Sequence, residues 1–142
     1  MTKLSPHIEI TDQPIDEGKV IEFAKSDLAG AVVLFLGTTR RLTGNVETET
    51  LKYECYQAMA VQEMASLFHQ AATRWPLQGG AMVHRIGDVP IGQTSVAIAV
   101  STPHRIDAFA AGQWLIDNLK ERVPIWKKEC FSNGTSQWIH EK

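Results

Sequence analysis

The chain has 142 residues, which is the size of one ordinary domain, and we treat 1–142 as a single domain. Fourteen basic side chains against sixteen acidic ones leave a formal net charge of −2, which argues against a nucleic-acid binder with a broadly basic surface. Hydrophobic residues make up 44%, close to the globular average, and no apolar run reaches the roughly 18 residues of a membrane span.

The first half of the chain alternates strand-like and helix-like hydrophobic patterns. Asp16, or the residue before it, is in position to cap the first helix. The sequence GAVVLFL at 30–36 is an almost continuous β-prone run, which predicts a central strand buried on both faces. The polar stretch 37–50 is expected to form one long loop. The predicted elements are strands over 7–11, 30–36 and 51–56 and helices over 16–27 and 59–75, the second helix with an apolar stripe of Met64, Leu67, Phe68, Ala71, Ala72 and Trp75.

The second half of the chain continues the alternation. The strand over 94–101 alternates branched apolar residues with alanines, and the small alanines predict a helix packed closely on their face. Strand pairs interleaved with helices predict an α+β domain, with helices packed on a mixed or mostly antiparallel sheet. The other predicted elements are strands over 81–86 and 125–131, turns over 87–92 and 132–134, and a helix over about 103–120 with a stripe of Ala108, Phe109, Gly112, Leu115, Ile116 and Leu119.

The familiar sequence motifs for cofactors and metals are absent. There is no G-x-G-x-x-G, P-loop, H-E-x-x-H or G-x-S-x-G motif. No two of the five histidines have the i, i+4 spacing of helical metal ligands, so we expect neither a metal site nor a bound cofactor. Cys55 and Cys130 form no C-x-x-C pair, and we expect two reduced thiols in a cytoplasmic protein.

Two candidate ligand-binding segments follow predicted strands. The first, GTTRR at 37–41, combines threonine hydroxyls with arginines that can bind a phosphate, although a solvated turn is the simpler alternative. The second, STPHR at 101–105, opens a helix, where free N–H groups and two cationic residues suit a phosphate or carboxylate. Its alternative is ordinary capping, with His104 and Arg105 in solvent.

A third segment, LKERVPIWKKE at 119–129, contains Lys120 at the end of the helix and Lys127 at the start of the last strand. Pro124 redirects the chain, so both amines can reach one cleft, where apolar neighbours suit an amine to proton transfer or to attack on a carbonyl. The alternative is a pair of solvated lysines, one favoured by the helix dipole. If the three segments converge, they form one cationic pocket for a small anionic substrate.

In these segments the chain resembles the large, catalytic subunit family of molybdopterin synthase. The match runs through GAVVLFLGTTR (30–40), LKYECYQAMA (51–60), the block 84–129 and GTSQW (134–138). The combination of PHR-x-x-AF with LK-x-x-x-PIWKKE is specific. The resemblance implies an α/β hammerhead-type fold and a homodimer, with a small ubiquitin-like sulfur-carrier subunit docked at each end to give a heterotetramer.

The resemblance also implies a reaction. The small subunit ends in a Gly-Gly thiocarboxylate, and two sulfurs from successive tails are transferred to cyclic pyranopterin monophosphate to form the dithiolene of molybdopterin, with no metal in this step. Lys120 and Lys127 match the catalytic lysines, and the His104–Arg105 pair is contributed across the dimer in this family. The implied substrate contacts are Thr38, Thr39, Arg40, His104, Arg105, Lys120, Lys127, Lys128 and Glu129.

Two positions depart from the family pattern near the proposed phosphate contact. Thr39 stands where valine is usual, and Arg41 follows Arg40 directly. Either arginine could hold the phosphate, and Arg40 keeps the Gly-x-x-Arg spacing. The alternative function is a non-catalytic module that binds a phosphorylated ligand or a partner's C-terminal tail. Loss of Lys120 or Lys127 would abolish turnover by an enzyme but only weaken a binder.

Overall fold

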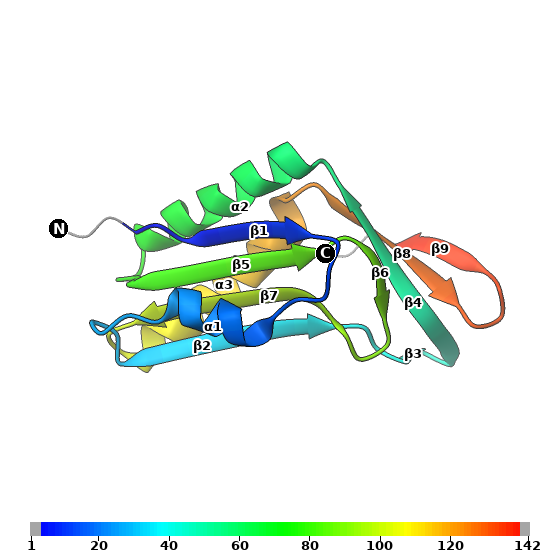
Figure 1. The fold of residues 1–142 in the computed structure, drawn as a ribbon, viewed down its shortest axis with the longest axis horizontal. Helices are drawn as coiled ribbons and strands as arrows, with labels where there is room; N and C mark the ends of the chain where they lie inside the picture. The colour runs from blue at the N-terminus through cyan, green and yellow to red at the C-terminus, as the bar shows by residue number, and fades with distance from the viewer. Residues whose placement is uncertain (1–3, 140–142) are drawn as a thin grey trace.

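The computed structural model describes residues 4–139, which form two β-sheets and three helices (Figure 1). The main sheet has four strands, and its strand order places chain-distant segments side by side. β1 pairs with β5 in parallel, and the other two pairings are antiparallel, so the sheet is mixed. The order is β1 (His7–Thr11), β5 (Gly79–Arg85), β7 (Thr94–Thr102) and β2 (Ala31–Thr38).

The second sheet has five strands and extends beyond one end of the main sheet (Figure 1); we call it the small sheet because three of its strands have only two to four residues. All its pairings are antiparallel, and its long strand β4 connects the other members. Side chains alternate between its two faces, so neighbouring residues of one strand point in opposite directions. Its strands are β3 (Leu42–Thr43), β4 (Val46–Cys55), β8 (Ile125–Phe131) and β9 (Ser136–Ile139), with β6 (Gly87–Pro90) paired to β4.

The three helices cover both faces of the main sheet: α1 (Glu17–Ala24) lies on one face, and α2 (Gln57–Ala72) and α3 (Arg105–Arg122) lie on the other (Figure 1). Asp16 caps α1 as predicted, because its carboxylate accepts a hydrogen bond from the Lys19 N–H at 3.2 Å. No helix within residues 4–139 is long and apolar enough to cross a membrane.

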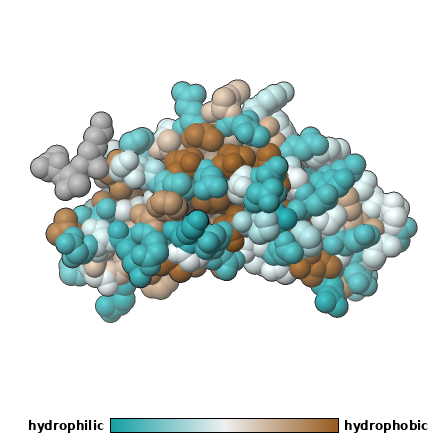
Figure 2. All heavy atoms as spheres, in the orientation of Figure 1, coloured by the Kyte–Doolittle hydropathy of each residue, from teal (hydrophilic) through white to brown (hydrophobic). Residues whose placement is uncertain are grey.

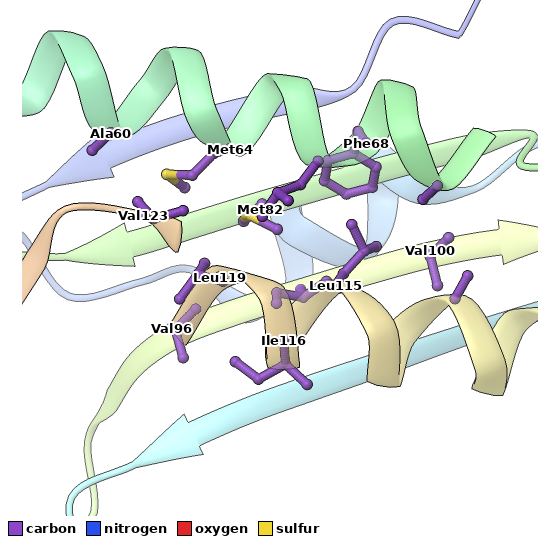
Figure 3. Packing of buried hydrophobic residues seen from close by; sticks show 14 residues of the cluster. Ala60, Met64, Phe68, Met82, Val96, Val100, Leu115, Ile116, Leu119 and Val123 are labelled. Carbon is purple, nitrogen blue, oxygen red and sulfur yellow. The ribbon is translucent and has the colours of Figure 1, made fainter. Parts of the chain in front are cut away.

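The alternation of β7 places one core on each face of the main sheet. Ala97 and Ala99 pack against α1, which confirms the prediction that a helix lies close to the alanine face. Ile98 and Val100 belong to the larger core between the sheet and the helix pair. In Figure 3, Met64 and Phe68 of α2 point toward the side chains of β5 and α3. Figure 2 shows hydrophobic residues gathered in the middle of one face, surrounded by hydrophilic ones.

The α+β class with a mixed sheet and packed helices is confirmed, but the position of the strand over 30–36 was predicted wrongly. It lies at the edge of the main sheet as part of β2, and its Val32 side chain is 40% exposed. The central strand with every residue buried is β7. An apolar run shows that a strand has hydrophobic surroundings, but the order of strands is set by pairings between segments far apart in the chain.

The predicted loop over 37–50 is also wrong, because most of it forms strands. β3 and the first half of β4 make a hairpin that turns at Gly44-Asn45, with Gly44 at φ 62°. The short strand β6 likewise occupies part of the predicted turn over 87–92. In the helices, Ala72 and Phe109 are exposed, and Phe109 is replaced in the buried stripe of α3 by Ala111.

Candidate functional site

A cavity of about 320 Å³ lies where the main sheet, the end of α3 and the inner face of the small sheet meet. We call it the lysine cavity, because both Lys120 and Lys127 line it. α3 ends at Arg122, Pro124 turns the chain, and β8 begins at Ile125, so the reversal brings the two lysines of one short segment to one cavity. The other polar residues in its wall include Thr38, Arg40, Thr43, Thr48, His84 and Glu129.

The alternation along β8 separates three charged neighbours. Lys127 and Glu129 face the lysine cavity. Lys128 lies between them in sequence and points to the opposite face of the small sheet, where its Nζ sits 5.7 Å from the ring centre of Trp138. The structure therefore does not bring Lys128 to the site that the resemblance implies for it.

Glu129 supplies a buried carboxylate to the cavity wall. Its side chain is 4% exposed, and its Oε2 accepts hydrogen bonds from Thr43 Oγ1 at 2.6 Å and from Thr48 Oγ1. These two donors satisfy this oxygen and fix the orientation of the carboxyl group. The sequence analysis missed both threonines, because they lie in the stretch that it treated as a loop, although the alternation of β-branched and charged residues from Val46 to Thr50 is a strand signal.

His84 is a third site residue that the sequence alone did not indicate. Its side chain is 3% exposed and lines the cavity, its Nδ1 lies 2.8 Å from the Arg85 carbonyl oxygen, and its ring meets the Tyr53 ring edge-on at 5.0 Å. Burial is the main reason that the pKa of His84 is lowered to about 4; the bond to the Arg85 carbonyl opposes this shift, and the charges of Lys120 and Lys127 add to it. The imidazole is therefore neutral at pH 7.

Only some residues of the GTTRR segment line the lysine cavity. Thr38 and Arg40 line the cavity, whereas Arg41 is exposed outside it, so of the two arginines the structure brings Arg40 to the site. Thr39 is 2% exposed, and its hydroxyl donates to the Val89 carbonyl at 3.0 Å, which holds the loop rather than facing the cavity. A Cβ at Gly37 would lie 2.7 Å from Val96 Cγ1, which explains why this close approach of β2 to β7 uses a glycine.

The STPHR segment does not reach the lysine cavity of its own chain. His104 and Arg105 are exposed at the start of α3, and His104, the N-cap residue, makes no side-chain capping bond. Lys120 lies near the other end of the same helix, about 22 Å along the helix axis from Arg105 at 1.5 Å per residue. Two of the three predicted cationic segments therefore converge within one chain, and the third does not.

Hydroxyls, cations and one carboxylate give the cavity its chemistry. It can hold a small anion through Arg40 and the two lysines, and it offers two amines beside apolar walls formed by residues such as Leu119 and Ile125. No group of three or more His, Cys, Asp or Glu residues within 4–139 is arranged to hold a metal ion. The same cavity is thus suited to proton transfer and anion stabilisation.

Comparisons with known proteins extend over nearly the whole chain. The molybdopterin synthase catalytic subunit of Bacillus subtilis is 41% identical over 134 residues, covering 94% of this chain and 85% of that protein. The crystal structure of molybdopterin synthase from Staphylococcus aureus matches with a TM-score of 0.88 and 42% identity, over 93% of this chain and 96% of that one.

A further solved structure is a complex of subunits 1 and 2 of the molybdopterin-converting factor from Helicobacter pylori. It matches with a TM-score of 0.74 and 25% identity, over 95% of this chain and 90% of that one. The model of the family described as MoaE protein matches residues 10–122. The chain therefore belongs to the MoaE protein family.

Proposed function

We propose that the chain is the catalytic subunit of a molybdopterin synthase. In this reaction, sulfur passes from the C-terminal thiocarboxylate of a small ubiquitin-like subunit to cyclic pyranopterin monophosphate, and two transfers form the dithiolene of molybdopterin. The observation that carries the proposal is the joint presence of Lys120, Lys127, Arg40 and Glu129 in the wall of one cavity. Relatives that share 41–42% of their residues with the chain are named catalytic subunits of this enzyme.

The cationic wall suits the substrate, which carries a cyclic phosphate. Arg40 presents a planar guanidinium that can donate two parallel hydrogen bonds to phosphate oxygens, and the Thr38 hydroxyl adds a donor from the same loop. We assign the phosphate contact to these two residues. Thr39 and Lys128 have no part in it, because the Thr39 hydroxyl is bonded to Val89 and Lys128 lies over Trp138.

The two lysines would act on the thiocarboxylate tail. Lys120 would polarise or protonate the thiocarboxylate carbonyl while the sulfur bonds to the pterin. Water, or the Lys120 amine in a brief amide-like adduct followed by water, would then replace the sulfur at that carbonyl and free the tail as a carboxylate. Lys127 would stabilise the negative charge that develops and relay a proton. Glu129, held by its two threonines, would orient the cations and the substrate around this point.

We also propose that a second copy of the chain completes the site. His104 and Arg105 lie far from the lysine cavity of their own chain, yet the family resemblance assigns them to the substrate. Beside them, Ile106 is 74% exposed and Phe109 is 64% exposed, and apolar side chains this open favour a protein contact. A homodimer in which the α3 helices of the two copies run antiparallel would bring each His104–Arg105 pair to the cavity of the other copy.

The small subunit would dock at each end of that dimer and give a heterotetramer. The Helicobacter pylori structure, a complex of two different subunits, supports such a partner for this chain. We place the assembly in the cytoplasm, because Cys55 and Cys130 are both free thiols in the structure and a reducing compartment keeps them so. Neither nucleic acid nor membrane is part of the proposed function.

The test is a single-turnover reaction of the protein with a thiocarboxylated Gly-Gly-tailed partner and cyclic pyranopterin monophosphate. The expected result is a mass increase of the pterin that corresponds to sulfur incorporation. Lys120→Ala and Lys127→Ala should lose this reaction while still binding the partner. Wild-type rates in both variants would overturn the catalytic assignment, and binding of the substrate without any turnover in the wild type would favour the alternative of a binding module.

A further inference from the structure

His84 occupies the point where the hydrophobic core gives way to the lysine cavity. Met82 lies two residues earlier in β5, on the same face of the strand, and is fully buried in the core. The register partners of His84 are Ile10 of β1 and Val96 of β7, both apolar. The titratable groups near it therefore come from the cavity side.

The titratable side chains on that side come from β4, β8, α3 and the loop after β2, which supplies Arg40. Tyr53 meets the His84 ring edge-on, Lys120 and Lys127 act on its charge, and Glu129 lines the same cavity. The two lysines are thus close enough to the imidazole for their charges to change its protonation.

The hydrogen bond at Nδ1 fixes the form of the ring. A carbonyl oxygen can only accept, so Nδ1, 2.8 Å from the Arg85 oxygen, must carry the hydrogen. In a neutral imidazole the other nitrogen, Nε2, then has a free lone pair and can only accept. Burial and the neighbouring ammonium groups keep the pKa of the ring at about 4, which makes this neutral form the one present at pH 7.

A neutral acceptor is unusual in a wall that is otherwise rich in charge. The Glu129 carboxylate already accepts bonds from Thr43 and Thr48 through one oxygen. A second carboxylate at position 84 would pair with the lysines and cancel the charge that a phosphate needs. An imidazole lone pair can orient an ammonium group while leaving its positive charge in place for the substrate.

We propose that His84 is a positioning residue for the lysine pair: its Nε2, the ring nitrogen not bonded to Arg85, is the acceptor that orients an ammonium group of Lys120 or Lys127 in the cavity they share. The inference deepens the proposed function and rests on it, because the lysines are the groups that would act on the thiocarboxylate. The competing explanation is a purely structural histidine, which packs against Tyr53 and ties the end of β5 to Arg85. The positioning role depends on Nε2 and the structural role depends on Nδ1, so variants that replace one nitrogen at a time distinguish the two roles.

Two substitutions test the two ring nitrogens separately. His84→Asn keeps a donor at the place of Nδ1, so it can retain the bond to Arg85 but cannot reach as far as Nε2. His84→Gln has a polar group at the distance of Nε2 and loses the short bond to Arg85. We expect His84→Phe, which keeps only a ring, to lower the single-turnover rate at least about tenfold, because the lysine pair loses a hydrogen bond that involves a charged group.

The decisive readout is the order of the two conservative variants. His84→Gln should recover more of the sulfur-transfer rate than His84→Asn, although His84→Asn should have the higher melting temperature. A rate for His84→Asn equal to or above that of His84→Gln would overturn the proposal, as would a wild-type rate in His84→Phe. Turnover by the wild type is measured first, so failure of the proposed function itself would be recognised before any variant is compared.

Nitrogen NMR tests the same inference without replacing His84. The long-range ¹H–¹⁵N spectrum of His84 at pH 7 should show a neutral ring with the hydrogen on Nδ1. Lys127→Ala should raise the pKa of His84, whereas Lys128→Ala, on the opposite face of β8, should leave it unchanged. A hydrogen on Nε2, or equal effects of the two lysine variants, would contradict the proposal.

Discussion

The two ends of α3 carry cationic residues in very different surroundings. At the C-terminal end, Lys120 lies in the wall of a cavity with Lys127, Arg40 and Glu129, all from the same chain. At the N-terminal end, Arg105 is exposed and has open apolar neighbours in place of a cavity. A helix is a stiff rod, so about 22 Å between Arg105 and Lys120 cannot be closed within one chain. His104 and Arg105 can therefore act at the same site as Lys120 only if a second copy of the chain supplies them.

The two faces of β8 repeat this contrast over a single residue. Lys127 points into the lysine cavity, and Lys128 points to the outer face of the small sheet. Charge, flexibility and position in the chain are almost the same for both side chains. Only the pleat of the strand separates them, which makes the pair a sharp test of whether the cavity is the site of chemistry.

The largest expected effect separates these two lysines. Lys127→Ala should lower the single-turnover rate of sulfur transfer by about 10²–10⁴-fold, the range for loss of a positioned acid–base group. Lys128→Ala should change the rate far less, because its ammonium lies over Trp138. Comparable losses in both variants would mean that the outer face of the small sheet also takes part in the reaction.

The next effect concerns the two ends of α3. Lys120→Ala and Arg105→Ala should each be nearly inactive as pure dimers. A mixed dimer, purified through two different tags, has one site with both residues intact, so it should regain about half of the wild-type activity. If the mixed dimer stays inactive, or if Arg105→Ala alone is fully active, the N-terminal end of α3 does not complete the site of a second copy.

The contrast along α3 also predicts stability. Leu115 is fully buried, and Leu115→Ala should lower the free energy of unfolding by about 4 kcal/mol, measured by urea denaturation. Phe109 is 64% exposed, and Phe109→Ala should change the stability of the isolated chain by only about 0.5 kcal/mol. It should instead weaken dimerisation in sedimentation experiments. An equal loss of stability in the two variants would show that Phe109 packs inside its own chain.

Much of this arrangement could be predicted from the sequence, because local periodicity determines it. The helices and most strands follow from apolar spacing, and the closeness of Lys120 and Lys127 follows from the turn at Pro124. Neighbouring residues of a strand face opposite sides of its sheet. The sequence could therefore also have predicted that Lys127 and Lys128, in the strand over 125–131, point in opposite directions.

The rest depends on contacts between distant segments, which no single window of sequence contains. The edge position of β2 is set by its pairing with β7, more than fifty residues away. His84 resembles an ordinary buried histidine until the folded chain brings Lys120 and Lys127 beside it. The length of α3 can be calculated from its number of residues. Which of its ends faces the cavity depends on contacts with distant segments and could not be predicted in this way.

The smallest effect is a pH dependence of stability that arises at the cavity end of α3. The pKa of His84 is about 4 in the folded chain and near 6.5 when unfolded, so between these values the unfolded state binds more protons. The stability that the neutral ring contributes is present above pH 6.5 and is lost as the pH falls toward 4. The loss should total about 3 kcal/mol for this group, since one pKa unit corresponds to about 1.4 kcal/mol.

Urea denaturation at a series of pH values measures this loss, and His84→Phe should have a smaller slope between pH 6.5 and 4 than the wild type. Lys127→Ala tests the cause, because removing one ammonium charge should bring the folded pKa closer to 6.5 and make the slope shallower. Lys128→Ala should leave the slope as it is. The same slope in the wild type and in His84→Phe would show that other groups, and not a neutral imidazole beside the lysines, control the acid sensitivity of the fold.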